Sequence, residues 1–75
     1  MTDQEVIAIL ANCKALAAKI QKLGVDFALN QNDSDTLLAF KAVYQSGRAW
    51  SLLPAAGLTQ QDYLLLGKLV GRKSI

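Results

Sequence analysis

The residues that most often perform chemistry are scarce in this sequence. The chain has one cysteine, Cys13, and no histidine, so it can form neither an internal disulfide nor a cysteine–histidine zinc site. Cys13 lies between Val6 and Ile20 in a helical pattern of apolar residues. Burial there would raise the thiol pKa, and no histidine is present to activate it. We therefore expect Cys13 to be a packing residue rather than a nucleophile.

The carboxylates also argue against catalysis. All of them except Asp26 lie near expected helix starts: Asp3, Glu5, Asp33, Asp35 and Asp62. At a helix N-terminus the dipole favours the ionised carboxylate over the protonated form that a general acid needs. The glycines are isolated, so they form no phosphate-binding loop. The sequence therefore predicts a protein that is not an enzyme and that uses no cofactor and no metal.

One polar segment, Asn30–Asp33, has the oxygen-rich composition of a calcium loop. Counted from Asn30, however, the sixth residue is Asp35 rather than glycine, and the twelfth is Lys41 rather than glutamate. We therefore expect the segment to begin a helix, with its cap among residues 32–34.

Length and composition fit one small domain over residues 1–75, since 52% of the residues are hydrophobic and 19% are charged. A core of this size rarely supplies more than about 3–5 kcal/mol, so self-association is expected to supplement it. The formal net charge of +2 is too small to indicate a polyanionic partner. No run approaches the roughly 18 apolar residues of a membrane span, and no signal peptide opens the chain. We expect a cytoplasmic protein with no membrane partner.

Local signals predict an all-α bundle of three helices, over residues 3–23, 34–52 and 60–70, completed by homodimerisation. In the first helix, Thr2 and Glu5 form a capping box, and Gly24 follows the end. Its apolar residues recur every seven positions in two sets: Val6, Cys13 and Ile20, and Ile9, Leu16 and Leu23. This stripe fits either the core of the chain itself or a seam shared with a second chain.

The second helix is expected to end before Pro54 and is apolar around most of its circumference. Such a helix is buried on several sides, which favours a second subunit as its cover. The third helix begins at a capping box formed by Thr59 and Asp62, with aspartate in the place of glutamate.

Trp50, the single tryptophan, is either a core anchor or an interface hot spot, and Tyr63 poses the same choice. We predict a small regulatory protein, such as an inhibitor, that occludes or scaffolds a partner protein through an apolar helical surface. The predicted interface residues are Val6, Ile9, Cys13, Leu16, Tyr44, Trp50, Leu53, Tyr63, Leu65 and Leu66.

The alternative is a DNA-binding transcriptional regulator. Residues 51–73 resemble a degenerate helix-turn-helix, with Gly57 in the turn and polar residues at the start of the second helix. The resemblance implies that three residues read base edges, namely Thr59, Gln60 and Gln61. It implies that three others contact phosphates, namely Lys68, Arg72 and Lys73.

Overall fold

Helices account for nearly the whole chain in the computed structural model, which describes residues 2–73. They are α1 (Asp3–Asn12), α2 (Lys14–Leu23), α3 (Gln31–Ser46), α4 (Ala49–Ala56) and α5 (Gln60–Lys73). No strand occurs among residues 2–73, so the predicted all-α class is confirmed. The predicted number of three helices was wrong, because four remain even when α1 and α2 are counted as one interrupted helix.

The first predicted helix is present but is interrupted. The capping box is confirmed, because the Glu5 amide donates to Thr2 Oγ1 at 3.2 Å and the Thr2 amide donates to Glu5 Oε1 at 3.0 Å. At Cys13 the backbone N–H bonds to the Leu10 carbonyl at 3.0 Å, a tighter turn than that of an α-helix. The two halves of the interrupted helix pack against different helices: α1 mainly contacts α4, whereas α2 mainly contacts α5.

The second predicted helix is divided into α3 and α4. Asn30 is the cap of α3, its side chain accepting a bond from the Asp33 amide at 2.7 Å, so the helix starts before the predicted residue 34. Gly47, with φ +73°, ends α3 in the left-handed conformation. Pro54 lies inside α4 rather than after its end. Its ring holds φ near a helical value, but it removes one backbone hydrogen bond and crowds the carbonyl of Trp50, four residues earlier.

This division accounts for the apolar circumference of residues 34–52. Phe40 and Val43 belong to α3, while Ala49 and Leu53 belong to α4, which has a different axis. Both helices pack against α1. Residues 2–73 of one chain therefore enclose a core of sixteen buried apolar residues: Val6, Leu10, Cys13, Leu16, Ala17, Ile20, Leu37, Phe40, Val43, Ala49, Leu53, Ala56, Leu58, Tyr63, Leu66 and Leu69. The accessible surface of 4425 Å² is close to the roughly 4,500 Å² typical of a folded monomer of 8.1 kDa. A second subunit is not required to enclose this core.

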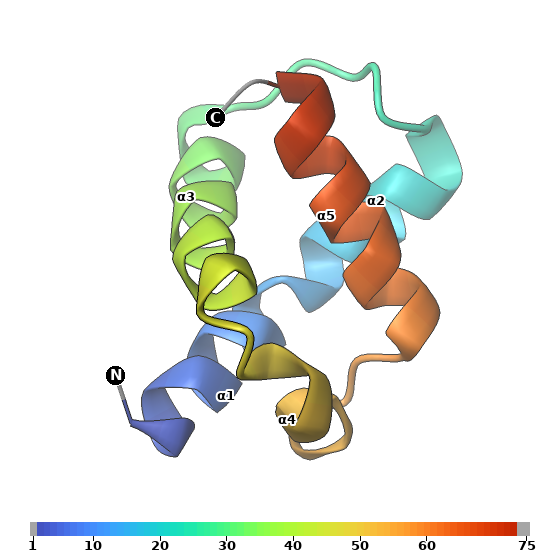
Figure 1. The fold of residues 1–75 in the computed structure, drawn as a ribbon. Helices are drawn as coiled ribbons and strands as arrows, with labels where there is room; N and C mark the ends of the chain where they lie inside the picture. Colours follow the sequence, from blue (N-terminus) through green and yellow to red (C-terminus); the bar gives the residue numbers. More distant parts are fainter. Residues whose placement is uncertain (1, 74–75) are drawn as a thin grey trace.

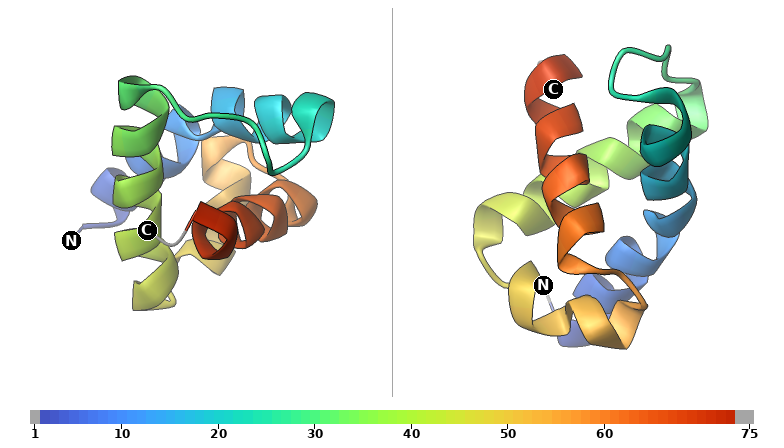
Figure 2. Two further views of the ribbon diagram at one scale, coloured as in Figure 1. Left: turned by 90° about the horizontal axis from the view of Figure 1, so that it is seen from above. Right: turned by 90° about the vertical axis from the view of Figure 1, so that its right-hand side faces the viewer.

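The helices cross one another around that core. In Figure 1, α3 lies on the left and α5 at the centre, α1 and α2 lie behind them, and α4 lies at the base. The view from above in Figure 2 shows that α3 and α5 cross at a steep angle instead of running parallel. The surface at which α3, α4 and α5 meet is the one that faces the reader in Figure 1.

The turn between α4 and α5 is built from two local motifs. The Gly57 amide bonds to the Pro54 carbonyl and the Leu58 amide to the Leu53 carbonyl, both at 3.1 Å, which is a Schellman motif. The predicted capping box of α5 is confirmed, because the Asp62 amide donates to Thr59 Oγ1 at 3.1 Å and the Thr59 amide to Asp62 Oδ2 at 3.4 Å. The fixed turn sets the angle at which α5 leaves α4.

Gly57→Ala is expected to destabilise the protein by about 1–2 kcal/mol, because the φ of +76° is costly for an L side chain. The new Cβ would also lie 2.7 Å from Lys14 Nζ, although that side-chain end can move aside. Gly71→Ala is the matched control, since it lies in α5 with open space around it and should stabilise by up to about 1 kcal/mol. Urea unfolding of both variants checks the prediction. Equal effects of the two substitutions would contradict it.

Candidate functional site: an exposed aromatic face

Enclosed sites are absent from the part of the chain that the structure describes. Residues 2–73 form no pocket and bring together no group of three metal-ligating side chains. Within the same range, every helix is too short or too polar to cross a bilayer. The search for a functional site therefore turns to the molecular surface.

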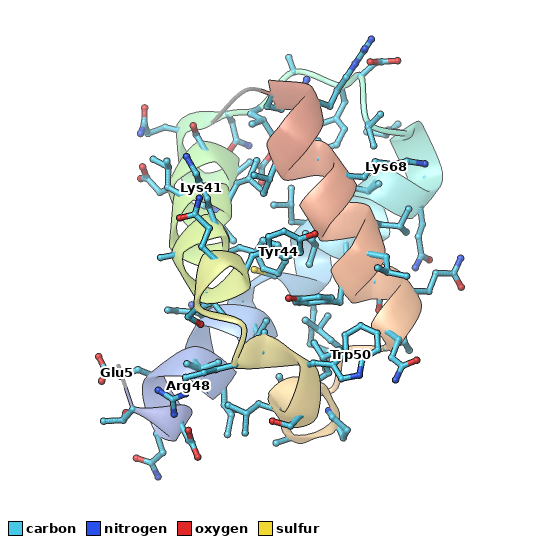
Figure 3. The ribbon with its side chains drawn as sticks, viewed as in Figure 1. Glu5, Lys41, Tyr44, Arg48, Trp50 and Lys68 are labelled. Atoms are coloured by element: carbon cyan, nitrogen blue, oxygen red, sulfur yellow. The ribbon has the colours of Figure 1, made fainter. Side chains whose placement is uncertain are left out.

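Three aromatic side chains meet where α3, α4 and α5 converge. Tyr63, almost buried in α5, lies at the centre, with its ring centroid 5.3 Å from that of Tyr44 and 5.5 Å from that of Trp50. Tyr44 and Trp50 are 40% and 47% exposed, although both rest against a buried ring. Figure 3 shows them on the surface formed by these three helices. The Tyr63 ring thus restricts the positions of both partly exposed rings.

Gly67 lets the Tyr44 ring lie directly against α5. A Cβ at Gly67 would be only 2.8 Å from Cε1 of Tyr44, so any larger residue would displace the ring. Leu64, one turn earlier in α5, is 60% exposed and extends the apolar surface along that helix. We call the surface formed by Tyr44, Trp50, Tyr63, Leu64 and Gly67 the aromatic face.

The support beneath the aromatic face is also aromatic. The buried Phe40 ring lies 5.7 Å from the Tyr44 ring and 5.6 Å from the Tyr63 ring, measured between centroids. Burial raises the pKa of the Tyr63 phenol, and the neighbouring Tyr44 adds to the shift. Tyr63 is therefore a neutral side chain at physiological pH. It contributes an apolar ring on which Tyr44 and Trp50 pack, and no charge.

Two lysines flank the aromatic face. Lys41 lies one turn before Tyr44 on α3, and Lys68 follows Gly67 on α5 (Figure 3). Neither forms an ion pair with any carboxylate of residues 2–73. The ion pairs of that range are Lys19 with Asp33, Arg48 with Asp3, and Arg72 with Asp26. The rim of the aromatic face is therefore basic and is not neutralised by acidic side chains of this chain.

Most of the predicted interface residues lie in the core instead of on a surface. Six of them are buried: Val6, Cys13, Leu16, Leu53, Tyr63 and Leu66. The apolar stripe of α1 and α2 packs inside the chain itself, against α3, α4 and α5. Ile9 and Leu65 are half-buried, and Tyr44 and Trp50 are exposed. Of the ten, only Tyr44 and Trp50 are exposed, and Tyr63 is the buried member of the aromatic face.

Sequence reasoning did not find the roles of Lys41, Leu64 and Gly67 in this face. None of the three is among the buried core residues, and the face exists only because three helices converge. The tight approach of Tyr44 to Gly67 has no signal within either helix alone.

The predicted nucleic-acid residues are partly engaged within the chain. α4, the turn and α5 do form a helix–turn–helix arrangement, and Gln60 and Gln61 are exposed at the start of α5. Arg72, however, pairs with Asp26 at 2.7 Å, and Lys73 Nζ donates to the Phe27 carbonyl at 2.6 Å. Thr59 caps α5. Lys68 is the one predicted phosphate-binding residue without such a contact among residues 2–73.

Fold and surface together define a class: a small all-α protein that has its own core, no pocket in the described range, and a preformed aromatic face with a basic rim. No protein-family model, no curated protein and no solved structure matches the chain.

Proposed function

We propose that this chain is a non-enzymatic binding protein that docks onto another protein through the aromatic face. The observation that carries the proposal is that Tyr44 and Trp50 stay 40% and 47% exposed while both pack on the buried Tyr63. Tryptophan and tyrosine dominate the energetics of protein interfaces, where a few such residues supply most of the affinity. Binding to these rings would cover a functional surface of the partner, as an inhibitor does. Alternatively, it would hold the partner in place, as a scaffold does.

The aromatic face is preorganised for binding. The Tyr44 ring is confined by Gly67 and Tyr63, and the Trp50 ring stands edge-on against Tyr63 at an interplanar angle of 75°. Immobilising a free side chain on binding costs about 0.5–1.5 kcal/mol, and this cost falls when the side chain is already held. Two anchors fixed in advance therefore give this small surface more affinity than its size alone suggests.

Tyr44→Ala combined with Trp50→Ala is expected to abolish docking. Loss of one interface hot spot weakens binding by at least about 2 kcal/mol, or roughly 30-fold in Kd, and two such losses remove a complex of ordinary affinity. The measurement is capture from an extract of the native host on the immobilised chain, followed by titration of each protein that is retained. Circular dichroism verifies that the double variant is folded.

The matched control is Leu23→Ala combined with Leu38→Ala, which also removes two exposed apolar side chains but leaves the aromatic face intact. Proteins retained by the wild type should be retained by this control and lost with the Tyr44 and Trp50 variant. The proposal fails when the variant without Tyr44 and Trp50 retains the same proteins with the same affinity.

A second copy of the chain is the alternative occupant, as the expected homodimer requires. In a symmetric pair, the same patch meets itself, so Lys41 and Lys68 of one copy would approach those of the other. Like charges at the rim oppose that arrangement. Sedimentation at micromolar concentration separates the two cases. A dimer that dissociates on Trp50→Ala would make the second copy the occupant, whereas a monomer leaves the face to a different protein.

DNA binding is the second candidate function, and the arrangement of α4, the Gly57 turn and α5 favours it. Glutamine at the start of a recognition helix can bond to adenine in the major groove. Replacing Gln60 and Gln61 by alanine should abolish binding to duplex DNA if this function holds. Docking through Tyr44 and Trp50 should be unchanged by the same replacement.

A further inference from the structure

Lys41 and Lys68 are the two basic residues at the rim of the aromatic face, and neither forms an ion pair with a carboxylate of residues 2–73. We infer that the segment that covers the aromatic face is acidic: a stretch of a partner protein that places carboxylates beside apolar or aromatic side chains. This inference rests on the proposed docking function and specifies the chemistry of the partner at the same surface.

The other basic side chains near helix ends have roles inside the molecule. Lys22 lies in the last turn of α2, and Arg72 and Lys73 lie in the last turn of α5, where the helix dipole favours a positive charge. Lys41 and Lys68 instead lie in the middle of α3 and α5, where that effect is small. Their position is therefore not accounted for by the helix dipole.

The carboxylates of residues 2–73 are engaged away from the aromatic face. Asp3, Asp26 and Asp33 pair with arginine or lysine elsewhere. Glu5 and Asp62 serve the two capping boxes. Asp35 accepts a bond from the side chain of Gln31 within the first turns of α3. No carboxylate of residues 2–73 therefore pairs with Lys41 or Lys68, and a bound partner would be able to supply the complementary negative charge.

An acidic protein segment fits this surface better than the other polyanions. Juxtamembrane segments that bind anionic lipid use clusters of about 4–8 basic residues, and duplex DNA binders commonly neutralise about 6–10 phosphates. The aromatic face offers two unpaired ammonium groups around an apolar centre, which matches one or two carboxylates beside an apolar anchor. Charge complementarity of this kind sets the choice of partner and speeds association.

The test is selection from a library of random peptides displayed on phage, with the immobilised full chain as target and the Tyr44→Ala, Trp50→Ala variant as counter-target. The expected result is enrichment, on the wild type only, of peptides that carry Asp or Glu beside Leu, Phe or Trp. Enriched peptides that depend on Trp50 but are neutral or basic would overturn the acidic partner while leaving docking intact. If no enriched peptide depends on Trp50, docking through this face fails, and the inference fails with it.

A synthetic copy of the most enriched peptide then tests the two lysines. Lys41→Gln combined with Lys68→Gln should weaken its binding roughly 2- to 30-fold, the range for two exposed ion pairs, and added salt should reduce the difference. Lys14→Gln combined with Lys22→Gln is the control of equal charge change, and it should leave the affinity unchanged. An equal loss in both variants would show a general charge effect and contradict the assignment.

Two further probes distinguish the other polyanions: oligothymidylate and vesicles that contain phosphatidylglycerol. If the partner segment is acidic, the peptide should bind more tightly than either probe. Tighter binding of oligothymidylate or of the vesicles, lost on Trp50→Ala, would assign the aromatic face to single-stranded nucleic acid or to a lipid surface instead.

Discussion

Phe40→Ala is expected to unfold most of the protein at room temperature. The Phe40 side chain is fully buried, and its ring supports both Tyr44 and Tyr63. Truncation of a core phenylalanine costs about 3–5 kcal/mol, which is as large as the stability that the core of so small a domain usually supplies. Urea unfolding followed by circular dichroism measures the effect.

Leu38→Ala is the control, because Leu38 belongs to the same helix but is 52% exposed. A surface substitution of this kind changes stability by no more than about 0.5 kcal/mol. A cooperative transition of nearly wild-type stability in Phe40→Ala would show that Phe40 does not support the core as described.

Native Cys13 is expected to react with thiol reagents about 10³-fold more slowly than Cys13 of the unfolded chain at about pH 8, where an ordinary thiol with a pKa near 8.5 is partly ionised. The cause is burial, which raises the pKa of the Cys13 thiol to about 12. Because the folded state holds this proton more tightly than the unfolded state, the associated stability is fully present below the unfolded pKa. It is lost as the pH rises toward the folded value.

The measurement is labelling with a chromogenic disulfide reagent in native buffer and again in urea. Labelling in urea shows that the thiol is intact and sets the reference rate. Rapid, complete labelling of the native protein would place Cys13 on an accessible surface and would contradict a core at the junction of α1 and α2.

The starts of α1 and α5 could be predicted from the sequence because their signals are local. Each capping box needs only two side chains three residues apart, and both boxes, at Thr2 and at Thr59, have the expected hydrogen bonds. The breaks were harder to predict. Pro54 was read as the end of the middle helix, but Gly47 with its left-handed backbone divides that helix, and Pro54 is accommodated inside α4.

The aromatic face could not be predicted because it depends on contacts between helices. Tyr44 and Gly67 are far apart in the chain, and only the packing of α3 against α5 brings the ring within contact of the glycine backbone. From the sequence, Trp50 and Tyr63 each fit either a core position or an interface position. The structure separates them, with Tyr63 buried and Trp50 exposed. Heptad spacing in residues 3–23 left a seam with a second chain open beside the chain's own core, and in the structure that stripe is core.

An exposed face built on a buried core also separates stability from function. Tyr44 and Trp50 are partly exposed, whereas Phe40 is fully buried beneath Tyr44. The proposed docking is therefore tested with Tyr44 and Trp50 variants whose folding is verified separately.

Hydroxyl-radical footprinting tests the central claim most directly, because it reports the solvent access of individual aromatic side chains. In the free chain, Trp50 and Tyr44 should be oxidised readily, while Phe40 should be protected. In the complex with a protein captured from the native host, oxidation of Trp50 and Tyr44 should fall sharply, and Phe40 should stay protected. Unchanged oxidation of Trp50 and Tyr44 in the complex would contradict docking through the aromatic face.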